Sequence, residues 1–357
     1  MILAFPMWRK GFAKPCGSVI DEALRRGHHV DLLCGEDAKP GEYVSRADVK
    51  RQWPAACALT ILDKRPDAII GDPSIGEMPG LPAAPKYALD FVWEQRMRKP
   101  MPGVTRCWAT EDQLETFGGV ETWASEFGRI RKIRDRDPVI GMTALDALPL
   151  VDPAAVRAKY NLGDRPILLL FALKFGGVNH LWRQTTYRWW HYMKLLRAIR
   201  AYCDRHGYAL VVKTREKNHD PAFVRDLADR VIGDESLWPY TSAELVRVAA
   251  LAIHFQSGAV FECAAARVPQ LSIAMPQPHL AHLGGHDVFF STAPRSLQHW
   301  PGVVQSVGWQ DAAYLFAHGR VWDTTIGYER MAYADRFVGP LDGKSAVRVL
   351  DMIEARQ

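Results

Sequence analysis

The stretch that most constrains the fold is LAIHFQSGAVFECAAARVPQLSIAM, residues 251–275. Residues 251–255 form a continuous apolar run, which is typical of a strand buried on both faces of a parallel sheet. A sharp Gln256-Ser257-Gly258 turn follows, then a run of small residues that predicts a helix lying close to the sheet, and residues 270–275 predict another strand. This order of strand, helix and strand indicates the α/β class with a doubly wound parallel sheet.

The turn has the composition of an anion site. Ser257 offers a hydroxyl, Gly258 leaves the backbone open, and the first N–H groups of a helix favour a negative charge such as phosphate. Glu262 lies four residues beyond Gly258, on the same helix face, and could reach the hydroxyls of a ribose attached to that phosphate. An ordinary capped crossover helix explains the same pattern equally well.

The length and composition of the chain indicate the size and the class of the protein. A chain of 357 residues is too long for one compact core and predicts two domains. Apolar residues at 48% and charged residues at 24% are typical of a soluble globular protein. A net charge of +5 tolerates anionic ligands without requiring nucleic acid. Residues 129–136 concentrate five of the basic side chains, and a polyanionic or membrane-surface role for them stays open.

The cysteines are scattered, without a CxxC pair or the spacing of a metal finger, and we expect reduced thiols in a cytoplasmic protein. No apolar run approaches the roughly 20 residues of a membrane span. Peripheral association with the inner face of a membrane stays open. The six cysteines are Cys16, Cys34, Cys57, Cys107, Cys203 and Cys263.

The first half begins with a predicted strand at residues 2–7. A polar loop carrying Lys10, Gly11, Lys14 and Gly17 is expected next, followed by a helix over 18–26 with Ser18 and Asp21 in a capping box. Further along, we predict helices at 43–64, 111–117 and within 120–132. The predicted strands of this half lie at 28–33, 67–72, 87–93, 106–109 and 139–142.

A proline-bearing linker at residues 146–153 predicts the domain junction. The first domain is then 1–150 and the second 151–357, with the last helix, 344–355, free to pack back on the first. In the second half, helices are predicted at 154–160, 187–206, 221–231, 241–248 and 310–319, and strands at 167–173, 208–214, 288–290 and 303–307. Two strand-helix alternations predict two doubly wound domains with a ligand cleft between them.

Three segments carry a resemblance to a known superfamily. They are GFAKPCGSVIDEALRRGHHVDLL, VIGMTALDALPLVDPAAVRAKYNLGDRPILLLF and QSGAVFECAAARVPQL. They resemble the first strand-helix unit, the interdomain hinge and the donor-binding turn of the GT-B glycosyltransferases and their relatives, the nucleotide-sugar 2-epimerases and CDP-glycerol glycerophosphotransferase-like enzymes. The resemblance implies two Rossmann-like domains and a nucleotide-sugar substrate.

The chain departs from two of these relatives. Residues 276–279, Pro-Gln-Pro-His, stand where the 2-epimerases carry an acidic-arginine segment. Lys213-Thr214-Arg215 stands where the glycerophosphotransferases carry Lys-Pro-His-Pro. From the GT-B resemblance we expect a glycosyltransferase that needs neither metal nor cofactor and acts on a surface polysaccharide or glycolipid acceptor. A 2-epimerase, a polyol-phosphate transferase and a non-catalytic nucleotide-sugar-binding protein remain alternatives.

We expect the residues of the site to lie close to the carboxyl ends of the predicted strands. A departing diphosphate needs cations and backbone donors, and an acceptor hydroxyl needs a base. We expect Asp72 or Glu94 to be the base, and Lys10 and Lys14 to lie on the acceptor side. The expected donor-binding residues are Lys174, Gly176, Lys213, Arg215, Ser257, Gly258 and Glu262.

Overall fold

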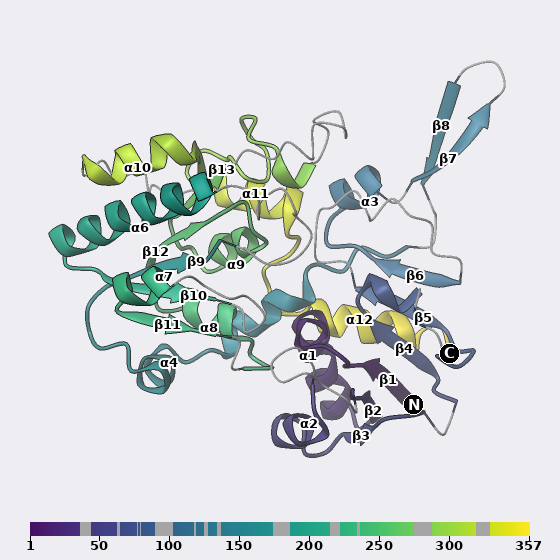
Figure 1. Ribbon diagram of the computed structural model, residues 1–357. Helices are drawn as coiled ribbons and strands as arrows, with labels where there is room; N and C mark the ends of the chain where they lie inside the picture. The colour runs from purple at the N-terminus through teal and green to yellow at the C-terminus, as the bar shows by residue number, and fades with distance from the viewer. Residues whose placement is uncertain are drawn as a thin grey trace. The chain divides into compact units, whose positions relative to one another are not determined.

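The computed structural model describes residues 1–35, 44–62, 65–76, 78, 80–89, 103–117, 119–124, 128–133, 137–173, 186–214, 222–233, 236–274, 288–318 and 329–357. The chain forms two compact units (Figure 1). The first unit comprises Met1–Leu150, Leu237–Tyr240 and Ala334–Gln357, and the second comprises Val151–Ser236 and Thr241–Tyr333.

The first unit is built on a six-stranded parallel sheet of order β3-β2-β1-β4-β5-β6. This order is that of doubly wound nucleotide-binding sheets. The predicted strands at 2–7, 28–33, 67–72, 87–93 and 106–109 are confirmed within the described residues. The strands are β1 (Ile2–Pro6), β2 (His29–Leu33), β3 (Cys57–Leu59), β4 (Ala68–Gly71), β5 (Lys86–Leu89) and β6 (Val104–Cys107).

Helices cover this sheet, and the last helix of the chain belongs to the same unit. Helix α12 packs on α1, and the Asp146 carboxylate accepts a hydrogen bond from the Ala346 N–H at 2.9 Å. The helical elements are α1 (Lys10–Arg25), α2 (Arg46–Gln52), η1 (Pro73–Gly76), α3 (Glu111–Phe117), η3 (Thr143–Leu150) and α12 (Ser345–Glu354).

The start of α1 corrects the sequence prediction. The expected polar loop is helical from Lys10, with Pro15 and Gly17 inside the helix. Gly17 is needed for packing rather than for a turn, because a Cβ there would lie 2.2 Å from Cδ2 of Trp238. Ser18 is a buried helix-interior residue whose hydroxyl donates to the Thr143 carbonyl at 2.9 Å. The predicted Ser18 capping box is therefore wrong.

Three other predictions for this half are wrong. Residues expected to be helical within 120–132 form an antiparallel hairpin of β7 (Gly119–Ala124) and β8 (Gly128–Ile133). The long helix predicted at 43–64 is divided between α2 and the short edge strand β3. The strand predicted at 139–142 is a single bridge between Val139 and Trp108. The partners of β3 and of Val139 are distant in sequence, so local patterns did not reveal these two pairings.

The second unit repeats the same sheet, in the order β11-β10-β9-β12-β13-β14. All five residues of β9 are buried, so helices cover both faces of this strand. The expected strand at 288–290 is instead a 3-10 turn, η5 (Val288–Phe290), and β11 overlaps the end of the predicted helix 221–231. The strands are β9 (Ile167–Phe171), β10 (Ala209–Lys213), β11 (Arg230–Ile232), β12 (Ala249–His254), β13 (Gln270–Ala274) and β14 (Val304–Gly308).

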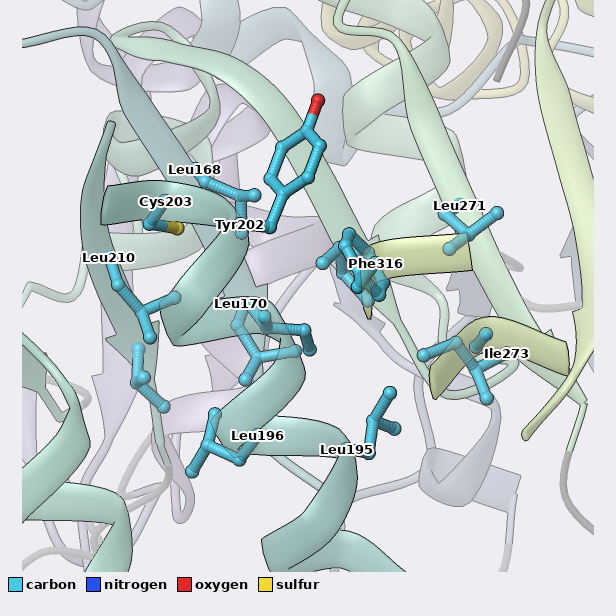
Figure 2. Close-up of a cluster of buried hydrophobic side chains, with 14 of the residues drawn as sticks. Leu168, Leu170, Leu195, Leu196, Tyr202, Cys203, Leu210, Leu271, Ile273 and Phe316 are labelled. Atoms are coloured by element: carbon cyan, nitrogen blue, oxygen red, sulfur yellow. The ribbon is translucent and has the colours of Figure 1, made fainter. Parts of the chain in front are cut away.

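A cluster of buried apolar side chains packs on this sheet (Figure 2). Leu168 and Leu170 of β9 and Leu271 and Ile273 of β13 form one buried cluster with apolar residues of α6 and α10, including Phe316. Among the described residues, no helix is long and apolar enough to span a membrane. The helices are α4 (Pro153–Tyr160), α6 (Thr186–His206), α7 (Ala222–Leu227), α8 (Thr241–Val246), α9 (Ala259–Ala265), α10 (Trp309–Ala317) and α11 (Glu329–Phe337).

Candidate functional site

The topology of the second sheet singles out one position for a ligand. Strand order reverses between β9 and β12, and open α/β sheets bind ligands at the carboxyl ends of strands at such a reversal. Strand β12 ends at His254, so the Ser257 turn follows directly at this point. The turn expected from the sequence to bind an anion therefore occupies the topological switch point of its unit.

The turn is tight and locally strained. Gln256 has a φ of 43°, in the left-handed region that costs free energy for a residue with a side chain. The Gln256 side-chain amide donates to the carbonyl of Phe290 at 2.9 Å. Gly258 is the N-cap of α9, and the Val260 N–H donates to the Ser257 carbonyl at 3.1 Å. The expected order of strand, Ser-Gly turn and helix is confirmed.

Two of the donors at the turn are already used within the protein. The Ser257 N–H donates to Nδ1 of His254 at 3.4 Å, and the Ala259 N–H donates to Oγ of Ser257 at 3.3 Å. Within the described part of the chain, the structure records no acceptor for the Gly258 N–H or the Ser257 hydroxyl hydrogen. These two groups are the donors that the turn offers to an anion.

A series of buried hydrogen bonds connects the turn to the rest of the unit. The His254 imidazole is fully buried, and its Nε2 lies 3.0 Å from Oε1 of Gln270. Since Nδ1 accepts from Ser257, the network assigns the proton to Nε2, which donates to Gln270. The Gln270 amide in turn donates to the Val260 carbonyl at 3.2 Å. Strand β12, the turn, helix α9 and strand β13 are thereby linked.

Burial decides the charge of this histidine. Desolvation lowers the pKa of His254 to about 4, outweighing the hydrogen bond to Gln270, which raises it. The imidazole is therefore neutral near pH 7, as its role as acceptor for Ser257 requires. Sequence reasoning did not select His254. The available signal was a histidine as the last residue of an otherwise apolar strand, directly before the turn.

Glu262 lies on the first turns of α9, as expected, but its carboxylate is enclosed. The residue is 1% exposed, and its Oε1 accepts a hydrogen bond from the Ser242 hydroxyl of α8 at 3.3 Å. A ribose hydroxyl would reach this carboxylate only by displacing what covers it. The assignment of Glu262 to ribose binding stays a prediction.

Lys213 ends β10 at the same edge of the sheet. Its backbone pairs with Phe171 of β9, so the order β10-β9-β12 brings Lys213 and the Ser257 turn to one edge, as the sequence predicted. The side chain is buried, and its ammonium donates to the carbonyl of Thr214. A phosphate contact would require a new rotamer. The other predicted donor residues, Lys174, Gly176 and Arg215, lie outside the described residues.

In the first unit, Asp72 directly follows β4, next to β1, where that sheet also reverses its order. The Asp72 carboxylate accepts hydrogen bonds from the N–H of Ser74, at 2.8 Å, and from the Ser74 hydroxyl. These bonds cap η1, so Asp72 has a structural role at the place expected for a catalytic base. Glu94, the other expected base, lies outside the described residues.

The two expected acceptor-side lysines lie on α1 rather than in a loop. Lys10 is the first residue of the helix, and Lys14 lies one turn further along. The Lys14 ammonium is 4.8 Å from the ring centroid of Tyr240, within range of a cation-π interaction. Their role toward a phosphorylated acceptor stays a prediction.

Comparison with known proteins identifies the fold. No family profile and no curated protein matches the chain. Among solved structures, the UDP co-structure of S. aureus MnaA matches with a TM-score of 0.58 at 14% identity, covering 99% of this chain and 96% of that one. The UDP-GlcNAc 2-epimerase from Neisseria meningitidis bound to UDP-GlcNAc gives 0.54 at 13% identity over 99% and 100%. The calicheamicin glycosyltransferase CalG4 gives 0.52 at 14% identity over 99% and 97%.

These matches agree with the two parallel six-stranded sheets of the described residues. At these identities the likeness concerns the fold. The expected resemblance is confirmed at that level, and the chain has the GT-B fold, with two Rossmann-like units.

Proposed function

We propose that this protein is an enzyme acting on a nucleotide sugar, with the nucleotide diphosphate bound at the Ser257 turn of the second unit. The observation that carries the proposal is the position of this turn at the switch point between β9 and β12. The Gly258 N–H and the Ser257 hydroxyl supply donors there, in a fold shared with proteins whose structures contain UDP or UDP-GlcNAc.

The finer proposal is a metal-independent glycosyltransferase. Negative charge grows on the diphosphate as the sugar leaves, and donors held at the turn stabilise that charge without rearranging. Lys213, at the same edge of the sheet, would add a positive charge, together with Lys174 and Arg215. Asp72 or Glu94 would take the proton of the acceptor hydroxyl. The proposed acceptor is a surface polysaccharide or a glycolipid.

A 2-epimerase is a second candidate. The 2-epimerase bound to UDP-GlcNAc matches the fold with a TM-score of 0.54. The glycosyltransferase CalG4 matches about equally well, with a TM-score of 0.52. The fold therefore supports both reactions equally. The sequence favours the transferase, since residues 276–279 depart from the acidic-arginine segment of the epimerases.

Ligand screening followed by product analysis tests the proposal. Thermal shift against UDP, GDP, CDP, CMP and TDP sugars should select one nucleotide class, and no stabilisation by any of them would overturn the proposal. The selected sugar is then incubated alone and with acceptors. Release of nucleoside diphosphate with a glycosylated product supports the transferase, whereas isomerisation without an acceptor identifies an epimerase. Binding without either product indicates a non-catalytic binder.

Metal dependence is tested separately. Protein treated with a chelator should retain full transfer activity, because the proposed stabilising groups are backbone donors and cationic side chains. Loss of turnover that added magnesium restores would contradict the metal-independent mechanism while leaving nucleotide binding at the Ser257 turn in place.

A further inference from the structure

Three potential metal ligands meet at the edge of the first unit's sheet. His29 and Asp31 are two residues apart on β2, so their side chains lie on the same face of the sheet. Cys57 is the first residue of the neighbouring edge strand β3, and the parallel register pairs it with Asp31. One ligand atom from each of the three residues lies within 4.8 Å of the others.

The ligand set is that of a borderline-soft divalent cation. Imidazole nitrogen, carboxylate oxygen and thiolate sulfur are the donors that zinc takes, whereas magnesium and calcium select oxygen alone. Bonds of about 2.0 to 2.3 Å in a tetrahedral arrangement place ligand atoms roughly 3.3 to 3.8 Å apart. Two ligand atoms 4.8 Å apart would therefore need to close by about 1.0 to 1.5 Å, whereas His29 Nε2 and Asp31 Oδ1, which are 2.9 Å apart, would need to separate slightly. The half-exposed His29 and the partly exposed Cys57 leave room for that adjustment.

Burial also favours a ligand at this position. The Asp31 side chain is only 5% exposed, and its Oδ1 lies 2.9 Å from Nε2 of the half-exposed His29. A buried carboxylate needs a positive partner, and a bound cation would supply one. Cys57 is partly exposed, whereas the other five cysteines of the chain are buried.

We propose that His29, Asp31 and Cys57 bind one zinc ion, with a solvent molecule in the fourth position. Binding requires the neutral imidazole and the thiolate, so the Cys57 S–H bond breaks, its proton passes to solvent and a sulfur-zinc bond forms. The ion joins β2 to β3, an edge strand of three residues. The site lies on strands β2 and β3 of the first unit and does not depend on the nucleotide site proposed at Ser257.

The test uses the full chain, first freed of metal with a chelator and kept reduced. Zinc titration by calorimetry should give one equivalent per chain with release of a proton. Cobalt(II) should give a thiolate-to-metal charge-transfer absorption. Cys57→Ser should abolish that absorption and weaken zinc binding at least 10-fold, and His29→Ala should weaken it similarly.

Two matched controls isolate the site. His28→Ala removes the imidazole next to His29, which is hydrogen-bonded to Glu354 at 2.8 Å instead of facing the proposed site. Cys34→Ser removes a buried thiol that follows β2 in the chain. Both should bind zinc like the wild type. Zinc should raise the melting temperature of the wild type and of the two controls, but not that of Cys57→Ser. A cooperative melting transition of metal-free Cys57→Ser shows that this variant folds. Absence of stoichiometric zinc binding, or equal binding by folded Cys57→Ser, would overturn the proposal.

Discussion

The backbone N–H of Ser257 donates a hydrogen bond to Nδ1 of the fully buried His254, at 3.4 Å. The imidazole donates its own Nε2–H to Oε1 of Gln270 and so links the proposed nucleotide turn to two strands of the sheet. The geometry of the turn therefore depends on the neutral form of one histidine.

Replacing His254 with leucine should lower the free energy of unfolding by about 1 to 3 kcal/mol, because Gln270 and Ser257 lose buried hydrogen-bond partners. The double variant His254→Leu/Gln270→Leu should recover part of that loss, since both members of the buried pair become apolar. Nucleotide affinity should fall in both variants, because neither has an acceptor for Ser257. Denaturant unfolding and calorimetric titration measure the two effects. Recovery of affinity in the double variant would contradict a positioning role for His254.

The stability of the wild type should decrease with acid through the same residue. The pKa of His254 is about 4 in the folded protein, below the ordinary 6.5. Below pH 6.5 the unfolded chain takes up a proton that the folded chain does not. Stability is therefore unaffected above pH 6.5 and falls toward pH 4, by about 3 kcal/mol in total. The difference between wild type and His254→Leu, followed by urea unfolding from pH 7 to pH 4, isolates this contribution. A difference that does not change with pH would show that His254 titrates normally.

Gly17 and Gly11 provide a matched pair within α1. A Cβ at Gly17 would overlap the Trp238 ring, whereas a Cβ at Gly11 meets nothing within 4 Å. Gly17→Ala should destabilise the protein by about 1 to 3 kcal/mol through overpacking. Gly11→Ala should stabilise it by up to about 1 kcal/mol, as alanine favours the helix. Thermal unfolding of both variants checks the prediction, and equal effects would contradict tight packing of Trp238 on α1.

Glu262→Gln tests the proposed ribose contact while preserving side-chain volume in a buried position. Loss of a charge-assisted hydrogen bond should weaken nucleotide binding by about 10-fold to 100-fold. Glu244→Gln is the control, because Glu244 is also a buried carboxylate of the second unit and accepts bonds from Tyr160 at 2.6 Å and Lys159 at 2.9 Å. It should lower stability and leave nucleotide affinity unchanged. Unchanged affinity in Glu262→Gln would remove this residue from the site.

Local sequence predicted most of the second sheet and its turn. The predicted strands at 167–173, 208–214 and 251–255 correspond to β9, β10 and β12, because a strand buried on both faces is rich in apolar residues. The Ser257-Gly258 pair also predicted the start of α9, because a turn of this composition before a run of small residues is a local pattern. Strand order, and with it the coincidence of the turn with the switch point, required the tertiary structure.

Two errors in α1 lie where a distant residue contacts the helix. Gly11 and Gly17 indicated a loop, yet the chain is helical from Lys10, and Trp238 packs against Gly17 within that helix. Asp21, expected in a capping box, instead accepts hydrogen bonds from the indoles of Trp53, at 2.8 Å, and Trp238, at 2.7 Å. Desolvation by burial raises the pKa of its carboxyl. Trp238 is 217 residues from Asp21, so no local pattern could reveal this pairing.

The sequence by itself determined two strand-helix alternations and a Ser-Gly turn before a helix of small residues, because burial and backbone freedom act on neighbouring residues. The tertiary structure decided which strands pair, where α1 begins, that Leu237–Tyr240 belongs to the first unit, and that His254 supports the Ser257 turn. These features depend on hydrogen bonds and packing between residues far apart in the chain, which only the assembled fold brings together.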